Sequence, residues 1–304
     1  MEPSLGWAGQ ILRVNLSEGT QRIEPSERYY ADWLGGRGIG SWILFQEVPS
    51  DADALGPESK AILTVGPLVG TPAPASARTS VCAKNALTGG FCASNVGGHF
   101  GPELKCAGFD AVVIEGQAQE PVCLFVHDGK AEIMPADSVW GKTTFETGHA
   151  LRAALGDDHI QMASIGPAGE NMVRGACLIV GWGHAAGRGG VGAVFGSKKL
   201  KAIAVRGTRP VRVHDTQRFL REVERCSKKI DQAQSTHQLR ETGTHFYATG
   251  GADGRTPQTW RNFQDAFWPA QRAERIRQDV FQEKYEVCRT TCFNCPIFCG
   301  HLYG

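Results

Sequence analysis

The 304-residue sequence carries almost no net charge, because 32 lysines and arginines are balanced by 31 aspartates and glutamates. This balance gives no electrostatic reason to expect binding to nucleic acid or to an anionic membrane surface. The sequence has no run of about 18 apolar residues, which a membrane helix requires, and its first residues lack the basic start and apolar core of a signal peptide. We therefore expect a cytoplasmic chain with neither a nucleic-acid nor a membrane partner.

Cysteine is too sparse for a disulfide scaffold, since only ten cysteines occur in 304 residues. Four of them nevertheless lie within residues 288–299, and such crowding is typical of a metal site in a reducing compartment. The hydrophobic fraction of 41% is that of an ordinary globular chain that can bury a large core. The length favours two domains, or one large domain with an appended piece.

Glycine is scarce in one part of the chain only, because 32 of the 38 glycines lie in residues 1–207 and six in 208–304. Residues 127–130 predict a hairpin turn and residues 144–155 a helix. From Asp215 onward, apolar residues recur at helical intervals. The sequence thus predicts an α+β chain, with a β-rich domain at 1–207 and the start of a helical domain at 208–304. Apolar runs bounded by turn residues predict strands at 10–16, 61–65, 111–115, 122–126 and 201–205.

The glycine-rich segment 184–199 is the strongest internal candidate for a binding site. Its glycines allow a ligand to approach the backbone, and consecutive N–H groups can cradle a phosphate. Arg188, Lys198 and Lys199 would supply positive charge. The segment is not a Walker loop, and its Gly-x-Gly-x-x-Gly pattern is too common to establish a dinucleotide site. The alternative is a glycine-dense turn packed between strands.

Two further segments contain residues suited to binding. Arg78 follows a proline-rich loop and precedes an apolar strand, where its guanidinium could bind a phosphate through two hydrogen bonds. Asn95 is followed by Gly97 and other glycines, and its amide oxygen could bind a hard cation. The alternatives are a surface arginine and a plain loop. Three histidines show no ligand spacing among themselves: His99, His149 and His184.

The cysteines near the end of the sequence allow three interpretations. Cys292, Cys295 and Cys299 have the spacing C-x2-C-x3-C and could ligate a [4Fe–4S] cluster with a remote fourth thiolate. The same three with His301 could form a Cys3His zinc site. The spacing of Cys288, Cys292 and Cys295 matches that of radical S-adenosylmethionine enzymes. In those enzymes the cluster loop opens a barrel, and no barrel follows here. We prefer the cluster and expect the remaining six cysteines to be core or structural thiols.

Taken together, these segments resemble the aldehyde:ferredoxin oxidoreductase family, whose tungsten- or molybdenum-dependent enzymes use a bis-pterin cofactor. The resemblance runs from end to end of the chain. Besides the C-x2-C-x3-C motif, it is carried by residues 9–16, 34–39, 65–68, 100–105, 107–111, 165–171, 185–193 and 196–203.

The resemblance implies a first domain of two β-sheets that forms a base for the pterins, followed by helical domains. It implies that Cys292, Cys295 and Cys299 ligate a [4Fe–4S] cluster. It also implies that Asn95 and a backbone carbonyl of the Ala185–Ala186 segment, with Ala186 as the expected ligand, hold a Mg2+ that bridges the pterin phosphates. The implied cofactor-binding residues are Arg78, Asn95, Gly97, Ala185, Ala186, Gly187, Arg188 and Gly189.

The family's reaction oxidises an aldehyde to a carboxylic acid and passes two electrons through the cluster to ferredoxin. The resemblance therefore implies a small aldehyde as substrate and ferredoxin, or another electron-transfer protein, as partner. Two alternatives remain open: a relative that acts on another substrate such as an aryl-CoA, and a non-catalytic cofactor-binding or electron-transfer subunit.

Length adds a further expectation, because family members are about twice as long as this chain. We expect an N-terminal fragment, a split-gene half or a truncated reading frame that is inactive alone, with a C-terminal half as a possible separate partner. Cys288 replaces a usually basic residue, and as a hypothesis it could substitute for the missing fourth cluster ligand.

Overall fold

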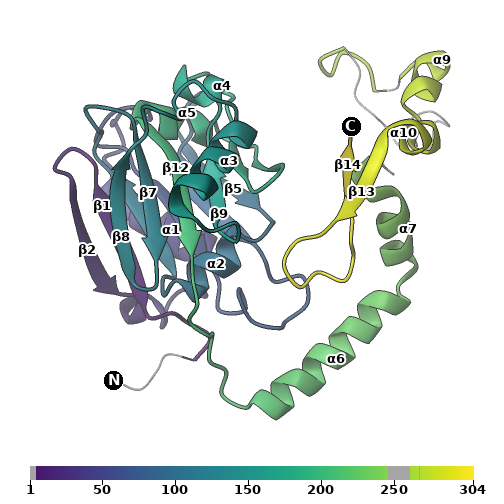
Figure 1. Ribbon diagram of the computed structural model, residues 1–304, viewed down its shortest axis with the longest axis horizontal. Coiled ribbons are helices and arrows are strands. Elements are labelled where there is room, and N and C mark those ends of the chain that lie inside the picture. Colours follow the sequence, from purple (N-terminus) through teal and green to yellow (C-terminus); the bar gives the residue numbers. More distant parts are fainter. Residues whose placement is uncertain (1–4, 246–260, 267) are drawn as a thin grey trace. The chain divides into compact units, whose positions relative to one another are not determined.

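The computed structural model describes residues 5–245, 261–266 and 268–304. The chain forms two compact units, unit 1 (Met1–Thr216) and unit 2 (Gln217–Gly304). Unit 1 contains two mixed six-stranded sheets with helices (Figure 1), which confirms the α+β prediction. The units divide after Thr216, and the domain boundary near residue 208 stays a prediction.

Sheet A has the strand order β2-β1-β6-β3-β4-β5, so β2 and β5 are its edges. Only β1 and β6 pair in parallel, and the other neighbours are antiparallel. In the central strand β1, Leu12 and Val14 face one side and Ile11 and Arg13 the other, as the two-residue period of a strand requires. The strands of sheet A are β1 (Gln10–Asn15), β2 (Thr20–Pro25), β3 (Ala61–Val65), β4 (Thr79–Lys84), β5 (Phe91–Val96) and β6 (Ala111–Glu115).

Sheet B has the order β11-β10-β9-β12-β7-β8, with β11 and β8 as edges. The predicted turn at 127–130 is confirmed, because His127 pairs with Lys130 across β7 and β8, and both turn residues have positive φ. The strands of sheet B are β7 (Val122–His127), β8 (Lys130–Pro135), β9 (Gln161–Ser164), β10 (Leu178–Val180), β11 (His184–Ala186) and β12 (Leu200–Arg206).

Each helix of unit 1 covers a defined surface of the sheets. α1 packs its apolar side chains on the outer face of sheet A, and α3 packs on the outer face of sheet B. α3 has the predicted bounds because Thr143 and Glu146 form a capping box at its start and Gly156, in left-handed conformation, ends it. The helices are α1 (Arg37–Glu47), α2 (Phe100–Cys106), α3 (Thr144–Leu155), α4 (Pro167–Glu170) and α5 (Val191–Ser197), with the 3-10 helix η1 (Glu27–Tyr29).

The main hydrophobic core lies between the two sheets. It joins the inward-facing residues of both sheets with Phe100 and Leu104 of α2 and Val194 and Phe195 of α5. All of these side chains are buried, so the two sheets form one rigid body from which loops and edge strands project. This rigidity matters for function because the candidate binding residues lie on edge strands and on the loops that follow them.

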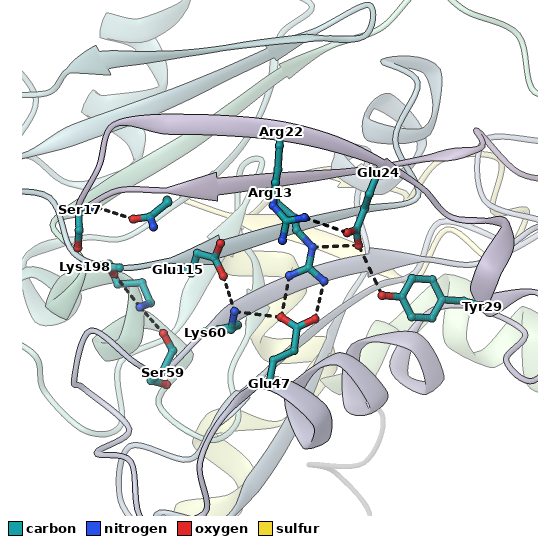
Figure 2. A network of polar contacts seen from close by, with 12 residues as sticks. Arg13, Ser17, Arg22, Glu24, Tyr29, Glu47, Ser59, Lys60, Glu115 and Lys198 are labelled. Atoms are coloured by element: carbon teal, nitrogen blue, oxygen red, sulfur yellow. Dashed lines mark hydrogen bonds and ion pairs between the residues drawn. The ribbon is translucent and has the colours of Figure 1, made fainter.

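A group of buried and partly buried charged residues, the Arg13 network, links sheet A to α1 (Figure 2). It consists of Arg13, Glu24, Glu47, Lys60 and Glu115. Arg13 donates to both carboxylate oxygens of Glu47 at 2.7 and 2.6 Å, and its Nε lies 2.9 Å from Glu24. Lys60 pairs with Glu47 at 3.0 Å and also with Glu115.

Unit 2 is mainly helical and ends in a small antiparallel hairpin of β13 and β14. α6 begins where the helical periodicity after Asp215 is predicted, and the sequence did not predict the terminal hairpin. None of the described helices is long and apolar enough to cross a bilayer. The described elements are α6 (Thr216–Gln232), α7 (Gln234–Thr242), η2 (Gly243–His245), α9 (Ala270–Ala273), η3 (Glu274–Ile276), α10 (Gln278–Tyr285), β13 (Glu286–Thr290) and β14 (Gly300–Tyr303).

Candidate functional site

Edge strand β5 of sheet A lies beside edge strand β11 of sheet B. The glycine-rich segment that follows β11 continues along β5 and is fixed there by hydrogen bonds. The Arg188 N–H donates to Ser94 Oγ at 3.1 Å, and the Gly189 carbonyl accepts from the Ala86 N–H at 3.0 Å. The meeting of two sheet edges therefore brings together segments that are about 90 residues apart in sequence. We call this place the cradle and define it as Arg78, Asn95, Gly97 and residues 184–189.

Arg78 and Asn95 reach the cradle through the pairing of β4 and β5. Ser80 pairs with Asn95 and Thr79 with Val96, which places Arg78 at the same end of the ladder as Gly97. Asn95 is exposed, and its Oδ1 accepts a hydrogen bond from Ser80 Oγ at 2.7 Å. An amide oxygen has a second lone pair that remains available to a hard cation.

His184 marks the end of the cradle near Arg78. Burial lowers the pKa of His184, and the positive charges of His99 and Arg78 lower it further. The three side chains therefore lie close enough to influence one another electrostatically. Since like charges destabilise the protonated imidazole, His184 faces the cradle mainly as a neutral side chain.

Glycine is required where the cradle backbone packs most closely. At Gly189, which has a φ of +70°, an added Cβ would overlap the sulfur of Cys92. Gly190 has a φ of +67°, and an added Cβ there would overlap the carbonyl of Arg174. Gly187 is exposed and meets only ordinary contacts at 3.5 Å or more. Two of these glycines thus serve packing, and Gly187 leaves the backbone open to a ligand.

Two arginines supply the positive charge of the cradle. Arg78 and Arg188 are exposed, and neither has an ion-pair partner among the residues that the structure describes. The sequence-based expectation that Lys198 and Lys199 also contribute charge is wrong. Lys198 is buried and donates to the carbonyls of Ser59 and Gly116, while Lys199 donates to a carbonyl on the loop before β7. Lys198 stabilises the fold because buried carbonyls require donors, whereas the carbonyl that Lys199 contacts is exposed.

The donor set of the cradle fits a phosphate-bearing ligand. Two unpaired guanidinium groups and an open glycine backbone suit phosphate oxygens, and the amide oxygen of Asn95 suits a hard divalent cation. Ala186 is buried and Ala185 exposed, on the strand beside β5. The assignments of Arg78, Asn95, Gly97 and residues 185–189 to a cofactor, and of Asn95 and Ala186 to Mg2+, stay predictions.

In unit 2, the three predicted cluster cysteines lie on the loop that joins β13 to β14. The pairing of Thr290 with Gly300 closes this loop. Inside it, the Cys295 N–H donates to the Cys292 carbonyl at 3.1 Å, and Thr291 Oγ1 donates to the Cys295 carbonyl at 2.8 Å. Arg240 of α7 donates to the Pro296 carbonyl at 2.9 Å. The loop therefore has a defined shape with both ends fixed.

The thiols of this loop are not gathered around a common centre. Within the described ranges, no three histidine, cysteine, aspartate or glutamate side chains lie together in positions that could hold a metal ion. None of the ten cysteines forms a disulfide, so Cys292, Cys295 and Cys299 are not paired with other thiols. Their chemistry fits an iron–sulfur cluster, and the cluster stays a prediction.

Two other candidates for the same metal site are placed on the hairpin itself. Cys288 is exposed on β13 opposite Leu302, so its role as a substitute ligand stays a hypothesis. The His301 Nδ1 lies 3.1 Å from a carboxylate oxygen of Glu286, and only 3% of the His301 side chain is exposed. Its Nε2 is buried and has no hydrogen-bond partner among the described residues, so the Cys3His zinc site stays a prediction.

Sequence reasoning missed the residues that hold the cradle together. Ser94, Ser80 and Ala86 bind cradle residues through the hydrogen bonds described above, yet none of them stands out by chemistry. The signal available was the glycine pair 89–90 between the two short segments 79–84 and 91–96, which is typical of a turn between antiparallel strands. That pairing would have placed Ser80 opposite Asn95.

Comparison with known proteins gives matches along nearly the whole chain. Residues 11–207 match the family model described as the N-terminal domain of aldehyde ferredoxin oxidoreductase, and residues 221–304 match the model of its domains 2 and 3. A tungsten-containing aldehyde ferredoxin oxidoreductase of Pyrococcus abyssi is 44% identical over 304 residues, which cover 98% of this chain and 49% of that protein. The corresponding protein of Pyrococcus furiosus is 41% identical over 97% of this chain.

Two more distant relatives are named for other functions. The WOR-like subunit of an aliphatic sulfonate oxidoreductase from Pyrococcus furiosus is 31% identical over 96% of this chain. Among solved structures, the active-site complex BamBC of benzoyl coenzyme A reductase matches with a TM-score of 0.85 and 29% identity, over 99% of this chain and 47% of that one. The chain spans about half the length of the curated relatives it matches.

Proposed function

This chain belongs to the aldehyde ferredoxin oxidoreductase family, and from that premise we propose that its cradle binds the phosphates of a tungsten bis-pterin cofactor in an enzyme that oxidises aldehydes to carboxylic acids. The observation that carries the proposal is the meeting of β5 and β11, which brings the exposed Arg78, Asn95 and Arg188 to one place. Molybdenum in place of tungsten is the variant of this proposal that the family resemblance leaves open.

Within this proposal each cradle residue has a physical task. Arg78 and Arg188 neutralise phosphate oxygens and fix their position through charge-assisted hydrogen bonds. The Asn95 amide oxygen and the Ala186 carbonyl would be ligands of a Mg2+ between phosphates. Gly97, Ala185 and Gly187 let the ligand approach the backbone, and Gly189 allows the segment to pack against Cys92. These tasks require a rigid support, which the buried core between the sheets provides.

The chemistry of the reaction belongs to the cofactor, which when bound supplies the two-electron redox change. The overall reaction consumes an aldehyde and water and yields a carboxylic acid, two protons and two electrons. We propose that ferredoxin, or another electron-transfer protein, accepts the electrons. Cys292, Cys295 and Cys299 would supply three thiolate ligands of a [4Fe–4S] cluster on that route. Reduced thiols suit assembly of the cluster in the cytoplasm, which is the location we propose.

The identity values favour an aldehyde over other substrates. Curated relatives named for aldehyde oxidation are 41–44% identical to this chain. The relatives named for a sulfonate and for benzoyl coenzyme A are 31% and 29% identical. An aryl-CoA substrate is therefore the second candidate, supported by the structural likeness alone.

Metal analysis tests the proposal. The protein would be purified from cells grown with tungstate and molybdate, and tungsten, molybdenum and iron would be measured by mass spectrometry. We expect tungsten or molybdenum in the wild type. Combined Arg78→Ala and Arg188→Ala substitutions should lower its content at least about tenfold, because a hydrogen bond to a charged group contributes about 1.5–3 kcal/mol. A wild-type protein with neither metal would refute the proposal.

A matched control distinguishes a local from a general effect of charge removal. Arg22 is exposed on β2, the opposite edge of sheet A from β5. Arg22→Ala should leave the tungsten content unchanged. Equal loss in Arg22→Ala and in the double variant would contradict the assignment of the cradle.

A further inference from the structure

The hairpin of β10 and β11 carries cradle residues 184–186, and Leu178, Val180 and Ala186 anchor its base in the main core. Both strands contain three residues, and β11 is an edge strand that pairs only with β10 in sheet B. The turn between them is Gly181-Trp182-Gly183, and Gly181 has a φ of +58°. A short edge hairpin of this kind is only marginally stable unless other contacts hold it.

Trp182, at the tip of this turn, is held by one face of α3. Its ring lies 6.1 Å from that of Phe145 and 5.2 Å from that of His149, in tilted and edge-on arrangements. The Arg152 guanidinium lies 5.2 Å from the centre of the Trp182 ring. Such aromatic and cation–π contacts are attractive. The three partners are spaced i, i+4 and i+7, so they form one stripe on the helix.

This stripe differs from the face by which α3 packs on sheet B. Leu151 belongs to the buried cluster with Ile160 and Met162, and Thr147 is fully buried. Arg152 is fixed further because its Nε donates to the Ile160 carbonyl at 3.1 Å. α3 is thus a rigid support with two faces, one for the core and one for Trp182.

His184, two residues after Trp182, is held on the opposite side of the cradle. Its imidazole packs on Gly98, in the loop that follows β5. A Cβ built on Gly98 would lie 3.0 Å from His184 Cδ2 and 3.2 Å from Val180 Cγ1, and Gly98 has a φ of +91°. The hairpin is therefore fastened at two points, to α3 on sheet B and to the Gly97-Gly98 loop on sheet A.

We propose that Trp182 and His184 form a two-point clamp that sets the spacing between the Ala185–Ala186 segment and Asn95, and that Trp182 is accordingly a positioning residue for the bound phosphates. The clamp acts through the hairpin, and Trp182 itself need not touch the ligand. The contacts of the clamp are formed within the chain and do not require a bound cofactor. Its effect on cofactor retention rests on the proposed function.

Hydrogen exchange tests the clamp without any need for cofactor. Amide exchange of peptides that cover residues 178–190 would be measured by mass spectrometry on the 304-residue chain. Trp182→Ala should increase exchange in this hairpin about tenfold or more, because opening no longer breaks the ring contacts. Trp182→Phe should retain most of the protection. Gly98→Ala should also increase exchange, since the added methyl group displaces the His184 ring.

Two more variants complete the design. Phe145 is 51% exposed, so Phe145→Ala should fold normally and increase hairpin exchange by a smaller factor, which keeps the test valid if Trp182→Ala fails to fold. Trp42 is a partly exposed tryptophan on α1 with aromatic contacts of its own, and Trp42→Ala should leave hairpin exchange unchanged. Exchange within twofold of wild type in both Trp182→Ala and Phe145→Ala would overturn the clamp.

Metal content of the same proteins then separates the clamp from the proposed function. If the wild type contains tungsten or molybdenum, Trp182→Ala should lose most of it and Trp182→Phe should keep it. If Trp182→Ala shows fast hairpin exchange and normal metal content, the positioning role is wrong although the contacts are real. If the wild type contains neither metal, the proposed function fails and the exchange data alone decide whether the clamp exists.

Discussion

Two groups of arginines in unit 1 occupy opposite environments. In the Arg13 network, Arg13 is 2% exposed, and two glutamates bind its guanidinium within 3 Å (Figure 2). In the cradle, Arg78 and Arg188 are exposed and lack carboxylate partners among the described residues. A buried charge must be paired to be tolerated, whereas an unpaired exposed charge remains available to an anion. The same residue type therefore stabilises the fold in one place and stays exposed at the candidate site in the other.

The pKa values express the same difference. Burial alone would raise the pKa of Glu47, but hydrogen bonds from Arg13 and Lys60 lower it to about 2. In the cradle, the neighbouring positive charges of His99 and Arg78 add to the effect of burial and lower the pKa of His184. Opposite charges compensate one another in the network, whereas in the cradle the positive charge of Arg78 favours the neutral form of His184. The positive charge of the cradle is compensated when an anion binds.

The largest effect on stability should come from breaking the network. Arg13→Met leaves Glu24 and Glu47 without their shared partner and should lower the free energy of unfolding by about 3–5 kcal/mol, as expected when one member of a buried ion pair is removed. Urea unfolding followed by tryptophan fluorescence would measure it. Arg22 lies directly opposite Arg13 in the β1–β2 ladder but has a side chain that is 64% exposed. If Arg22→Met lowered the free energy of unfolding as much as Arg13→Met, the difference between paired, buried arginine and exposed arginine would be contradicted.

The next effect concerns Lys198, which Figure 2 shows beside Ser59. Burial and the nearby positive charge of Lys60 lower the pKa of Lys198 from 10.5 to about 8. Between these values the unfolded chain binds more protons than the folded chain, so stability should rise as the pH increases from about 8 to 10.5. The gain from this group alone should be about 3 kcal/mol.

Unfolding measured across this pH window, in wild type and in Lys198→Met, checks the prediction. The variant has no side chain to titrate, so the part of the rise that Lys198 contributes should disappear. Identical pH dependence in the two proteins would show that Lys198 keeps an ordinary pKa in the folded state.

A smaller effect on stability is expected from the hydrogen bond between Ser80 and Asn95. Ser80→Ala removes the hydrogen bond to Asn95 Oδ1 and should lower the free energy of unfolding by about 1 kcal/mol. Urea unfolding would measure it, with Ser41→Ala on α1 as the control, because the Ser41 hydroxyl bonds only to the carbonyl of its own helix at Arg37. If the two variants had the same free energy of unfolding, water would replace the Ser80 hydroxyl at Asn95 without loss of stability.

The smallest effect should come from the cradle arginines themselves. Arg78→Ala and Arg188→Ala should each change the free energy of unfolding by no more than about 0.5 kcal/mol, as is usual for exposed residues away from a packed core. Their effect should appear in metal content instead. A loss above about 2 kcal/mol would place these arginines among structural residues and remove the distinction between the two regions.

The sequence predicted the interior of unit 1 better than its edges. Central strands such as β3 and β6 are continuous apolar runs because both of their faces are buried, and they are read easily. The edge strands β5 and β11 contain serine, asparagine, histidine and alanine, whose pattern does not distinguish a strand from a loop. Since the cradle lies on these edges, its residues were found through residue chemistry and family resemblance and not through periodicity.

The roles of the charged residues were predicted less well, because the direction of each side chain decides whether it is exposed at the cradle or buried in the fold. Arg188 and Lys198 lie ten residues apart in one glycine-rich segment, yet the first is exposed and the second is buried. α5 lies between them and turns the chain inward. The sequence alone does not show that Lys198 points inward, because its partners are the carbonyls of Ser59 and Gly116, which are distant in the sequence.

The hairpin of unit 2 has a consequence for the cysteines it presents. Pairing of Thr290 with Gly300 closes the loop 291–299 during folding, so the conformational entropy of bringing its ends together is already lost before any metal arrives. A metal that binds one of the three thiolates then meets the other two as intramolecular ligands at a high effective concentration. Capture of the first ligand should accordingly be the slow step of metal uptake, and the remaining thiolates should follow without any further encounter from solution.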